Sequence, residues 1–140
     1  MGFYNNAGGI AHPTTKEELI KEINIRLDRG QTNLNDIDTS KITDMSSLFY
    51  HVFQRRAIKN IDVSLWNTSN VTTMSYMFFG CSNLQKMAVA YSGTITASNW
   101  EYFLTYVSST GTFYYSKNQT KENIQSIVPS GWTLVQSTEW

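Results

Sequence analysis

Hydrophobic positions at helical spacing mark the first patterned segment of the chain, PTTKEELIKEINIRLDRG. Its apolar residues lie on one face of a helix: Leu19, Ile20, Ile23 and Leu27. A threonine followed three residues later by a glutamate can form a capping box at the start, and Gly30 suits the left-handed position after the end. The pattern therefore predicts a helix over about residues 15–29 that covers an apolar surface.

Downstream, strand-like and helix-like patterns alternate. Four segments have the apolar content of short strands: IKNIDVSL, LQKMAVA, GTFYYS and GWTLV. The first of them is expected to place Ile58, Ile61, Val63 and Leu65 near the core. Three segments have helical spacing: Met74 to Phe78, Trp100 to Val107, and a short helix that begins near Thr120 and ends before Pro129.

Part of this pattern occurs twice, in residues 37–50 and again 29 residues later. The matching positions are Thr39 and Thr68, Ser40 and Ser69, Ile42 and Val71, Thr43 and Thr72, Met45 and Met74, Ser46 and Ser75, and Phe49 and Phe78. Periods of about 20–29 residues that combine a strand with a short helix are typical of leucine-rich solenoids. Each coil of such a fold has an apolar edge that it buries by stacking on the next coil, and the end coils need caps.

The expected fold is therefore α/β, a short leucine-rich-repeat-type solenoid of strand–turn–short helix coils with an N-terminal capping helix. Its expected divisions are an extended arm in 1–13 and one solenoid domain in 14–140, made of a capping helix (14–30), repeats (31–110) and a C-terminal cap (111–140).

The second copy of the repeat, IDVSLWNTSNVTTMSYMFFGCSNL, resembles the BspA-like surface-protein repeat of the leucine-rich-repeat superfamily. The residues that match the repeat are Asn67, Thr68, Ser69, Asn70, Val71, Thr72, Met74, Met77, Phe78, Cys81 and Leu84. Thr73 replaces the usual aspartate, which the first copy keeps as Asp44. The clear similarity covers about residues 33–90. The resemblance implies a leucine-rich-repeat fold and, less specifically, a role as a surface adhesion or interaction module.

Composition narrows the classes of partner. The chain of 140 residues has a formal net charge of zero and no run of Lys or Arg, so we expect no nucleic acid partner. No segment approaches the ~20 consecutive apolar residues of a membrane span, and no secretory signal is recognisable at the start. The single cysteine, Cys81, excludes an internal disulfide framework.

The sequence contains few candidate catalytic or metal-binding residues. Cys81 with His12 or His51 could form a nucleophile and base, but no accompanying motif supports this, and the repeat places its cysteine inside the coil as a small apolar filler. The acids that might bind calcium have no recognised spacing: Asp36, Asp38, Asp44 and Asp62. We therefore expect no enzymatic activity, no metal and no cofactor.

Aromatic residues exceed what so small a core can hide, and exposed aromatic clusters mark contact surfaces. The candidate interaction residues are Phe3, Tyr4, Trp66, Tyr76, Tyr102, Tyr106 and Trp140. The first hypothesis is a structural component of a phage virion (capsid decoration, tail or fibre) that contacts neighbouring protein subunits and is oligomeric or assembly-bound. Its alternative is an adhesin fragment on a bacterial cell surface that binds host protein or glycan.

Overall fold

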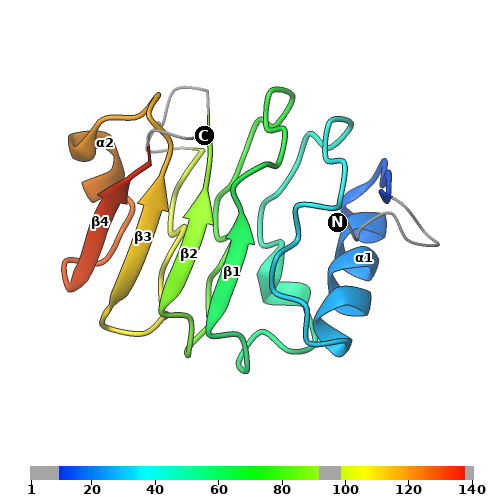
Figure 1. Ribbon diagram of the computed structural model, residues 1–140, viewed down its shortest axis with the longest axis horizontal. Coiled ribbons are helices and arrows are strands. Elements are labelled where there is room, and N and C mark those ends of the chain that lie inside the picture. Colours follow the sequence, from blue (N-terminus) through cyan, green and yellow to red (C-terminus); the bar gives the residue numbers. More distant parts are fainter. Residues whose placement is uncertain (1–9, 92–98, 138–140) are drawn as a thin grey trace.

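The computed structural model describes residues 10–91 and 99–137. Its elements in chain order are α1 (Lys16–Asp28), the 3-10 helix η1 (Phe49–His51), β1 (Asn60–Val63), β2 (Lys86–Val89), β3 (Gly111–Tyr115), α2 (Lys121–Gln125) and β4 (Trp132–Gln136). The four strands are parallel and form one sheet in sequence order, with α1 at one end of the row and α2 near the other (Figure 1).

Helix α1 forms as its pattern predicts. The hydroxyl of Thr15 accepts a hydrogen bond from the backbone N–H of Glu18, which satisfies one of the free donors at the helix start. Gly30 has a φ of 78° and ends the helix with a bond from its N–H to the carbonyl of Leu27. Leu19, Ile23 and Leu27 are buried, so the apolar face covers the end of the core.

The sheet buries one of its two faces. In β1 the side chains of Ile61 and Val63 are buried, and the register aligns them with Met87 and Val89 of β2. Alternation along a strand explains why one face is apolar, since successive side chains point to opposite sides. Leu65, expected near the core, is instead exposed, because it follows the end of the strand at Val63.

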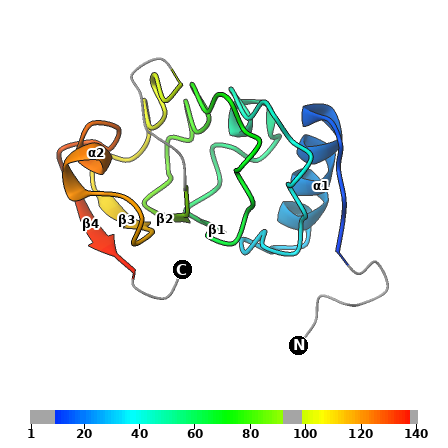
Figure 2. The same cartoon turned by 90° about the horizontal axis from the view of Figure 1, so that it is seen from above.

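On the side opposite the sheet, backbone groups bond from one chain segment to the next. The N–H groups of Met45, Ser47 and Phe49 donate to the carbonyls of Thr73, Ser75 and Met77 at 2.8–3.0 Å. The next segment repeats this: Met74, Tyr76, Phe78 and Gly80 donate to Asn99, Glu101, Phe103 and Thr105. Figure 2 shows these segments running side by side above the sheet.

The intervening residues bond locally. The N–H of Met77 donates to the carbonyl of Met74, and the N–H of Phe79 donates to the carbonyl of Tyr76. These are three-residue turns, and Tyr76 between them has a left-handed φ of 60°. An α-helix needs every N–H for its own bonds and right-handed backbone throughout, so it cannot form here.

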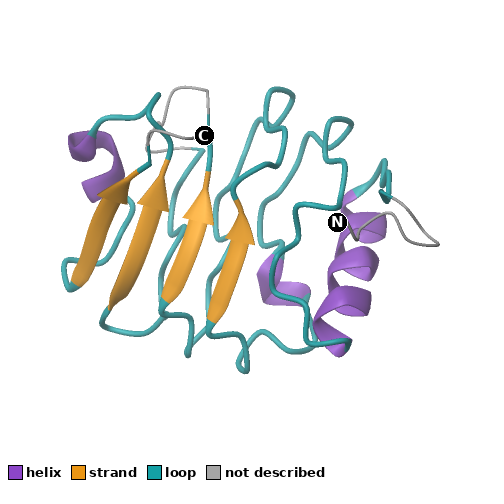
Figure 3. Ribbon diagram, in the orientation of Figure 1, coloured by secondary structure: helices purple, strands orange, loops and turns teal. Residues whose placement is uncertain are grey.

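The expected fold class is therefore wrong. The structure has one four-stranded parallel sheet and few helices, and it lacks the strand–turn–short helix coils of a leucine-rich-repeat solenoid in the described residues. The segments expected to be helices at 74–78 and 100–107 are turns, drawn as loops in Figure 3. The four strands, α1 and the short helix capped by Thr120 are confirmed.

Aromatic rings from successive segments pack against each other in the interior, one pair stacked and the next edge to face. The ring centroids of Phe49 and Phe78 lie 4.5 Å apart, and those of Phe78 and Phe103 lie 5.3 Å apart. All three side chains are buried. The repeated phenylalanine thus forms a continuous column, which explains why the sequence repeats it: each ring fills the space above the previous one.

A buried ion pair fixes α1 to the chain that follows it. The Nε of Arg26 donates to Asp36 at 2.8 Å, and its Nη1 donates to Glu22 at 2.8 Å. The Arg26 and Asp36 side chains are only 5% and 7% exposed. Removing one partner of such a pair leaves a charge that neither water nor protein satisfies well.

We expect Asp36→Ala to lower the free energy of unfolding by about 3 kcal/mol, because Arg26 then stays buried with Glu22 as its remaining acid. Urea denaturation followed by circular dichroism measures the change. Lys21→Ala, at an exposed position of the same helix, serves as the control and should change stability by less than about 0.5 kcal/mol. A loss for Asp36→Ala no larger than the control's contradicts the prediction.

Candidate functional site

Five aromatic side chains gather on the side opposite the sheet, and we call this surface the aromatic face: Tyr50, Tyr76, Phe79, Tyr102 and Tyr106. Ring contacts join them in a network. The centroid distances are 5.9 Å for Tyr50–Phe79, 5.4 Å for Tyr76–Phe79, 5.0 Å for Tyr76–Tyr102 and 5.1 Å for Phe79–Tyr106. The four tyrosines are exposed, with Tyr106 the most exposed at 71%.

The backbone on this side places the aromatic rings. Tyr76, Tyr102 and Tyr106 all have left-handed φ, between 55° and 62°. This conformation is unfavourable for residues with a Cβ, by roughly 1 kcal/mol or more each. Ser47 occupies the position equivalent to Tyr76 and has the same conformation, so the strain belongs to the turn. In the two following turns the equivalent position is a tyrosine, Tyr76 and Tyr102, and each of these side chains projects outward.

A cation borders the aromatic face. The guanidinium of Arg55 lies 4.5 Å from the ring centroid of Tyr50, and its Nη1 donates to the Tyr50 carbonyl at 3.1 Å. Gly80 lies beside this pair with a left-handed φ of 78°, and this backbone conformation, which residues with a Cβ rarely adopt, is what favours glycine here. The pair adds a positive charge and a cation–π contact at one edge of the face.

The structure brings three of the predicted interaction residues together on the aromatic face, and it buries a fourth in the core. Tyr76, Tyr102 and Tyr106 are all in the aromatic face. Trp66 is buried, and its Nε1 donates to the carbonyl of Leu34 at 2.8 Å, so it is not available for a surface contact. The remaining three, Phe3, Tyr4 and Trp140, lie outside the described residues.

Sequence reasoning missed Tyr50, although the repeat contained the signal. The 29-residue offset that aligns the two copies places Tyr50 on Phe79, just as it places Phe49 on Phe78. Because Phe49 and Phe78 stack inside, the residues that follow them have to meet outside, where their rings contact each other.

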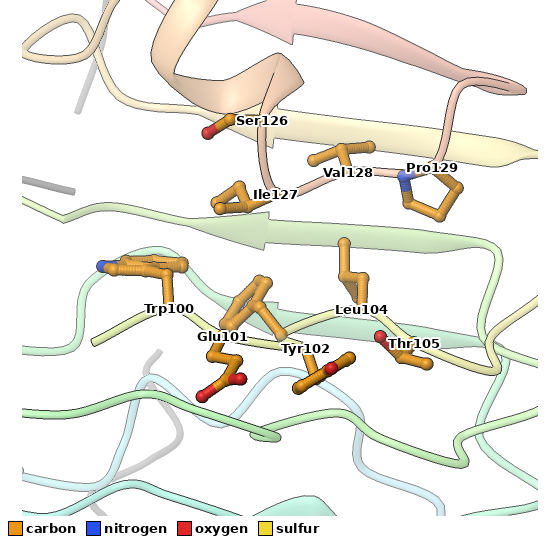
Figure 4. A pocket seen from close by; sticks show the side chains of 10 residues that line it. Trp100, Glu101, Tyr102, Leu104, Thr105, Ser126, Ile127, Val128 and Pro129 are labelled. Atoms are coloured by element: carbon orange, nitrogen blue, oxygen red, sulfur yellow. The ribbon is translucent and has the colours of Figure 1, made fainter. Parts of the chain in front are cut away.

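A hollow of about 590 Å³ lies beside the aromatic face, between residues 100–105 and 126–129. Figure 4 shows Trp100 and Leu104 pointing toward Ile127 and Val128, whereas Glu101 points away. Glu101 is the only carboxyl group among the lining residues. The hollow therefore has no pair of carboxyl groups for acid–base chemistry, and its walls are mainly apolar.

Cys81 does not have the surroundings of a nucleophile. Its side chain is fully buried, and burial raises the pKa of the thiol to about 12. The thiol is therefore protonated at neutral pH, whereas a reactive cysteine needs the thiolate. His12 instead bonds Asp38 at 2.9 Å, and the exposed His51 packs against the Tyr50 ring.

The four aspartates do not converge. Asp36 binds Arg26, and the other three each accept a bond from the backbone N–H two residues ahead: Ser40 to Asp38, Ser46 to Asp44, and Ser64 to Asp62. Asn67 makes the same turn with Ser69, so the spacing of these residues serves turn formation. Within residues 10–91 and 99–137, no group of three or more metal-ligating side chains is placed to hold an ion.

We expect Cys81 to resist alkylation while the protein is folded. Iodoacetamide reacts with the thiolate, which a pKa of about 12 and full burial suppress at pH 7.5. Mass spectrometry should show labelling at least about a hundredfold slower than in the urea-unfolded chain, which is the matched control. Rapid labelling of the folded protein contradicts the burial of this side chain.

No helix in the part of the chain that the structure describes is long and apolar enough to cross a bilayer, in agreement with the sequence. No curated protein and no solved structure gives a significant match to the chain. A family comparison does match, over residues 20–126, which include both copies of the repeat and most of the sheet. The chain therefore belongs to the family described as Mycoplasma protein of unknown function, DUF285.

Proposed function

We propose that the protein is a non-enzymatic interaction module that binds another protein through the aromatic face. The observation that carries this proposal is the ring-contact network of four exposed tyrosines and Phe79.

The chemistry of the face favours a protein partner. Tyrosine offers a large, rigid contact area together with a hydroxyl that can bond a partner's backbone or side chains. Tyrosine and arginine are also the residues that most often dominate the energy of protein–protein interfaces. Tyr76 and Tyr106 lie next to Phe79, which is only partly exposed, so an apolar centre has a polar rim.

The family supports a setting at the bacterial cell surface. Its members are described as Mycoplasma proteins, and the repeat resembles that of BspA-like surface proteins. A module with an exposed aromatic face and a net charge of zero suits adhesion to a host protein. The virion hypothesis expects the arm Phe3–Ile10 and Trp140 to anchor the chain in neighbouring subunits, and of these residues the structure describes Ile10 alone. It stays a prediction.

Two aspects of the chemistry support a non-enzymatic role. The Cys81 thiol is buried and protonated, and the hollow beside the face has Glu101 as the only carboxyl group among its lining residues. Binding requires neither an activated nucleophile nor an acid–base pair.

Site-specific cross-linking tests the proposal in cells that naturally make the protein. With the photoreactive residue p-benzoylphenylalanine at position 106, we expect one discrete heavier adduct, because Tyr106 is the most exposed ring of the face. The same residue at position 60, an exposed site on the outer face of the sheet, is the control and should give none of that adduct. Mass spectrometry identifies the cross-linked partner.

We expect the double change Tyr102→Ser and Tyr106→Ser to weaken binding of that partner at least about tenfold, because two exposed aromatic anchors are lost. Biolayer interferometry with the purified partner measures the affinity. Thermal unfolding should be nearly unchanged, since both side chains are exposed. Equal affinity of the variant and the natural chain overturns the proposal, as does the same adduct from position 60.

Protease treatment of intact cells distinguishes the two settings. Loss of the protein from the cell surface supports an adhesin. Recovery of the protein in purified phage particles, with none accessible on cells, overturns the cell-surface setting.

A further inference from the structure

The two edges of the sheet differ. The outer edge of β1 is covered, because Leu34 N–H donates to the Asp62 carbonyl and Asp62 N–H donates to the Thr32 carbonyl. Beyond that segment lies α1 (Figure 1). At the other end, β4 pairs only with β3 on its inner side, and no described residue forms a strand beyond it. An uncovered strand edge has backbone groups available to pair with another strand.

The register shows which backbone groups of β4 point outward. Ser137 N–H donates to the Tyr115 carbonyl, and in a parallel pair the bonding residues alternate along the strand. Thr133 and Val135 therefore also bond β3, and the backbone groups of Trp132, Leu134 and Gln136 point away from it. The N–H of Trp132 is already bonded, to the carbonyl of Pro129 at 3.0 Å.

A hollow lies next to part of this edge. It has a volume of about 480 Å³ and borders the first three residues of β4, between that strand and the segment formed by α2 and the loop after it. Lining it are Lys121, Gln125, Val128, Pro129, Ser130, Trp132, Thr133 and Leu134. Helix α2 thus leaves part of the strand edge uncovered.

Strand β4 itself lacks the usual protection against pairing, and Lys121 and Pro129 border only the hollow beside it. Exposed edge strands in soluble proteins commonly carry lysine, other charges or proline within the strand. The segment from Asn123 to Thr138 has no charged residue, and β4 itself, WTLVQ, has no proline. A second copy of the strand can therefore approach it without repulsion between like charges on the two strands.

We propose that two copies of this chain pair through β4, antiparallel, about a twofold axis at Leu134. Both backbone groups of Leu134 point outward, so the two leucines exchange a pair of hydrogen bonds. On each side of the axis, Gln136 N–H of one copy donates to the free Trp132 carbonyl of the other. The same strand supplies both halves, as a twofold contact requires.

This arrangement also fixes which side chains meet. Thr133 of one copy faces Val135 of the other, on the outer face of the sheet, at both ends of the short interface. Thr133 is exposed and Val135 is 37% exposed, so substitutions there leave the core intact. Two β-branched side chains suit this contact because they favour extended backbone.

Analytical ultracentrifugation of the full chain tests the proposal. We expect a monomer–dimer equilibrium at chain concentrations on the order of 100 µM, since a single strand pair is a small interface. The double change Thr133→Lys and Val135→Lys places lysine opposite lysine at both ends, and it should weaken dimerisation at least about tenfold.

A charge-complementary variant makes the test specific for the register. Thr133→Glu with Val135→Lys places glutamate opposite lysine at both ends, so this variant should dimerise like the natural chain and lose affinity in high salt. Circular dichroism confirms that both variants fold. The Tyr102→Ser and Tyr106→Ser chain is the matched control, and it should dimerise normally because its changes lie on the aromatic face.

Four outcomes overturn the inference: a natural chain that stays monomeric, a larger assembly in place of a dimer, lysine variants that dimerise as well as the natural chain, and a glutamate–lysine variant that fails to dimerise. Loss of the dimer in the tyrosine variant also overturns it, since the aromatic face would then be the contact. The first four results do not bear on partner binding by the aromatic face, which is measured with a different protein.

Discussion

Backbone hydrogen bonds between segments distant in sequence are the interaction on which the rest of the structure depends. On one side they form a parallel sheet, and on the opposite side the N–H groups of alternate residues donate to the next segment along. A buried backbone needs partners for nearly all of its polar groups, and here those partners belong mostly to a neighbouring segment. Each segment is therefore stable only when its neighbour is in place. The repeated Met and Phe side chains must then lie directly next to their equivalents in the neighbouring segment.

The same bonds determine which side chains reach solvent. At residues 74–80, alternate N–H groups bond across and the others close short turns, so the chain turns inward at Met77 and Phe78 and outward at Tyr76. Left-handed backbone at Tyr76 and Tyr102 is a requirement of that geometry, and the tyrosine rings then contact each other from segment to segment. The fold therefore determines which positions face solvent on this side, whereas the turn geometry does not require that these positions be tyrosine, as Ser47 shows.

How far the sequence predicts this structure depends on whether a signal is local. Helix α1 was predictable because Thr15, Gly30 and the apolar face are all within one segment. The turns at 74–78 were mistaken for a helix, since the spacing of Met74, Met77 and Phe78 suits either structure and the decisive bonds come from residues about 25 positions away. Trp66 looked like a surface residue for a similar reason: its bond partner, Leu34, is distant in sequence. The Tyr50–Phe79 contact was encoded in the repeat, but only the combination of repeat offset and inward stacking reveals it.

The direction of the bonds between segments has a mechanical consequence. The strands lie side by side along the longest dimension of the molecule, with α1 and β4 at opposite ends (Figure 1). Tension applied between those ends acts along the hydrogen bonds and loads one row at a time, so the chain would peel away segment by segment at low force and lengthen greatly.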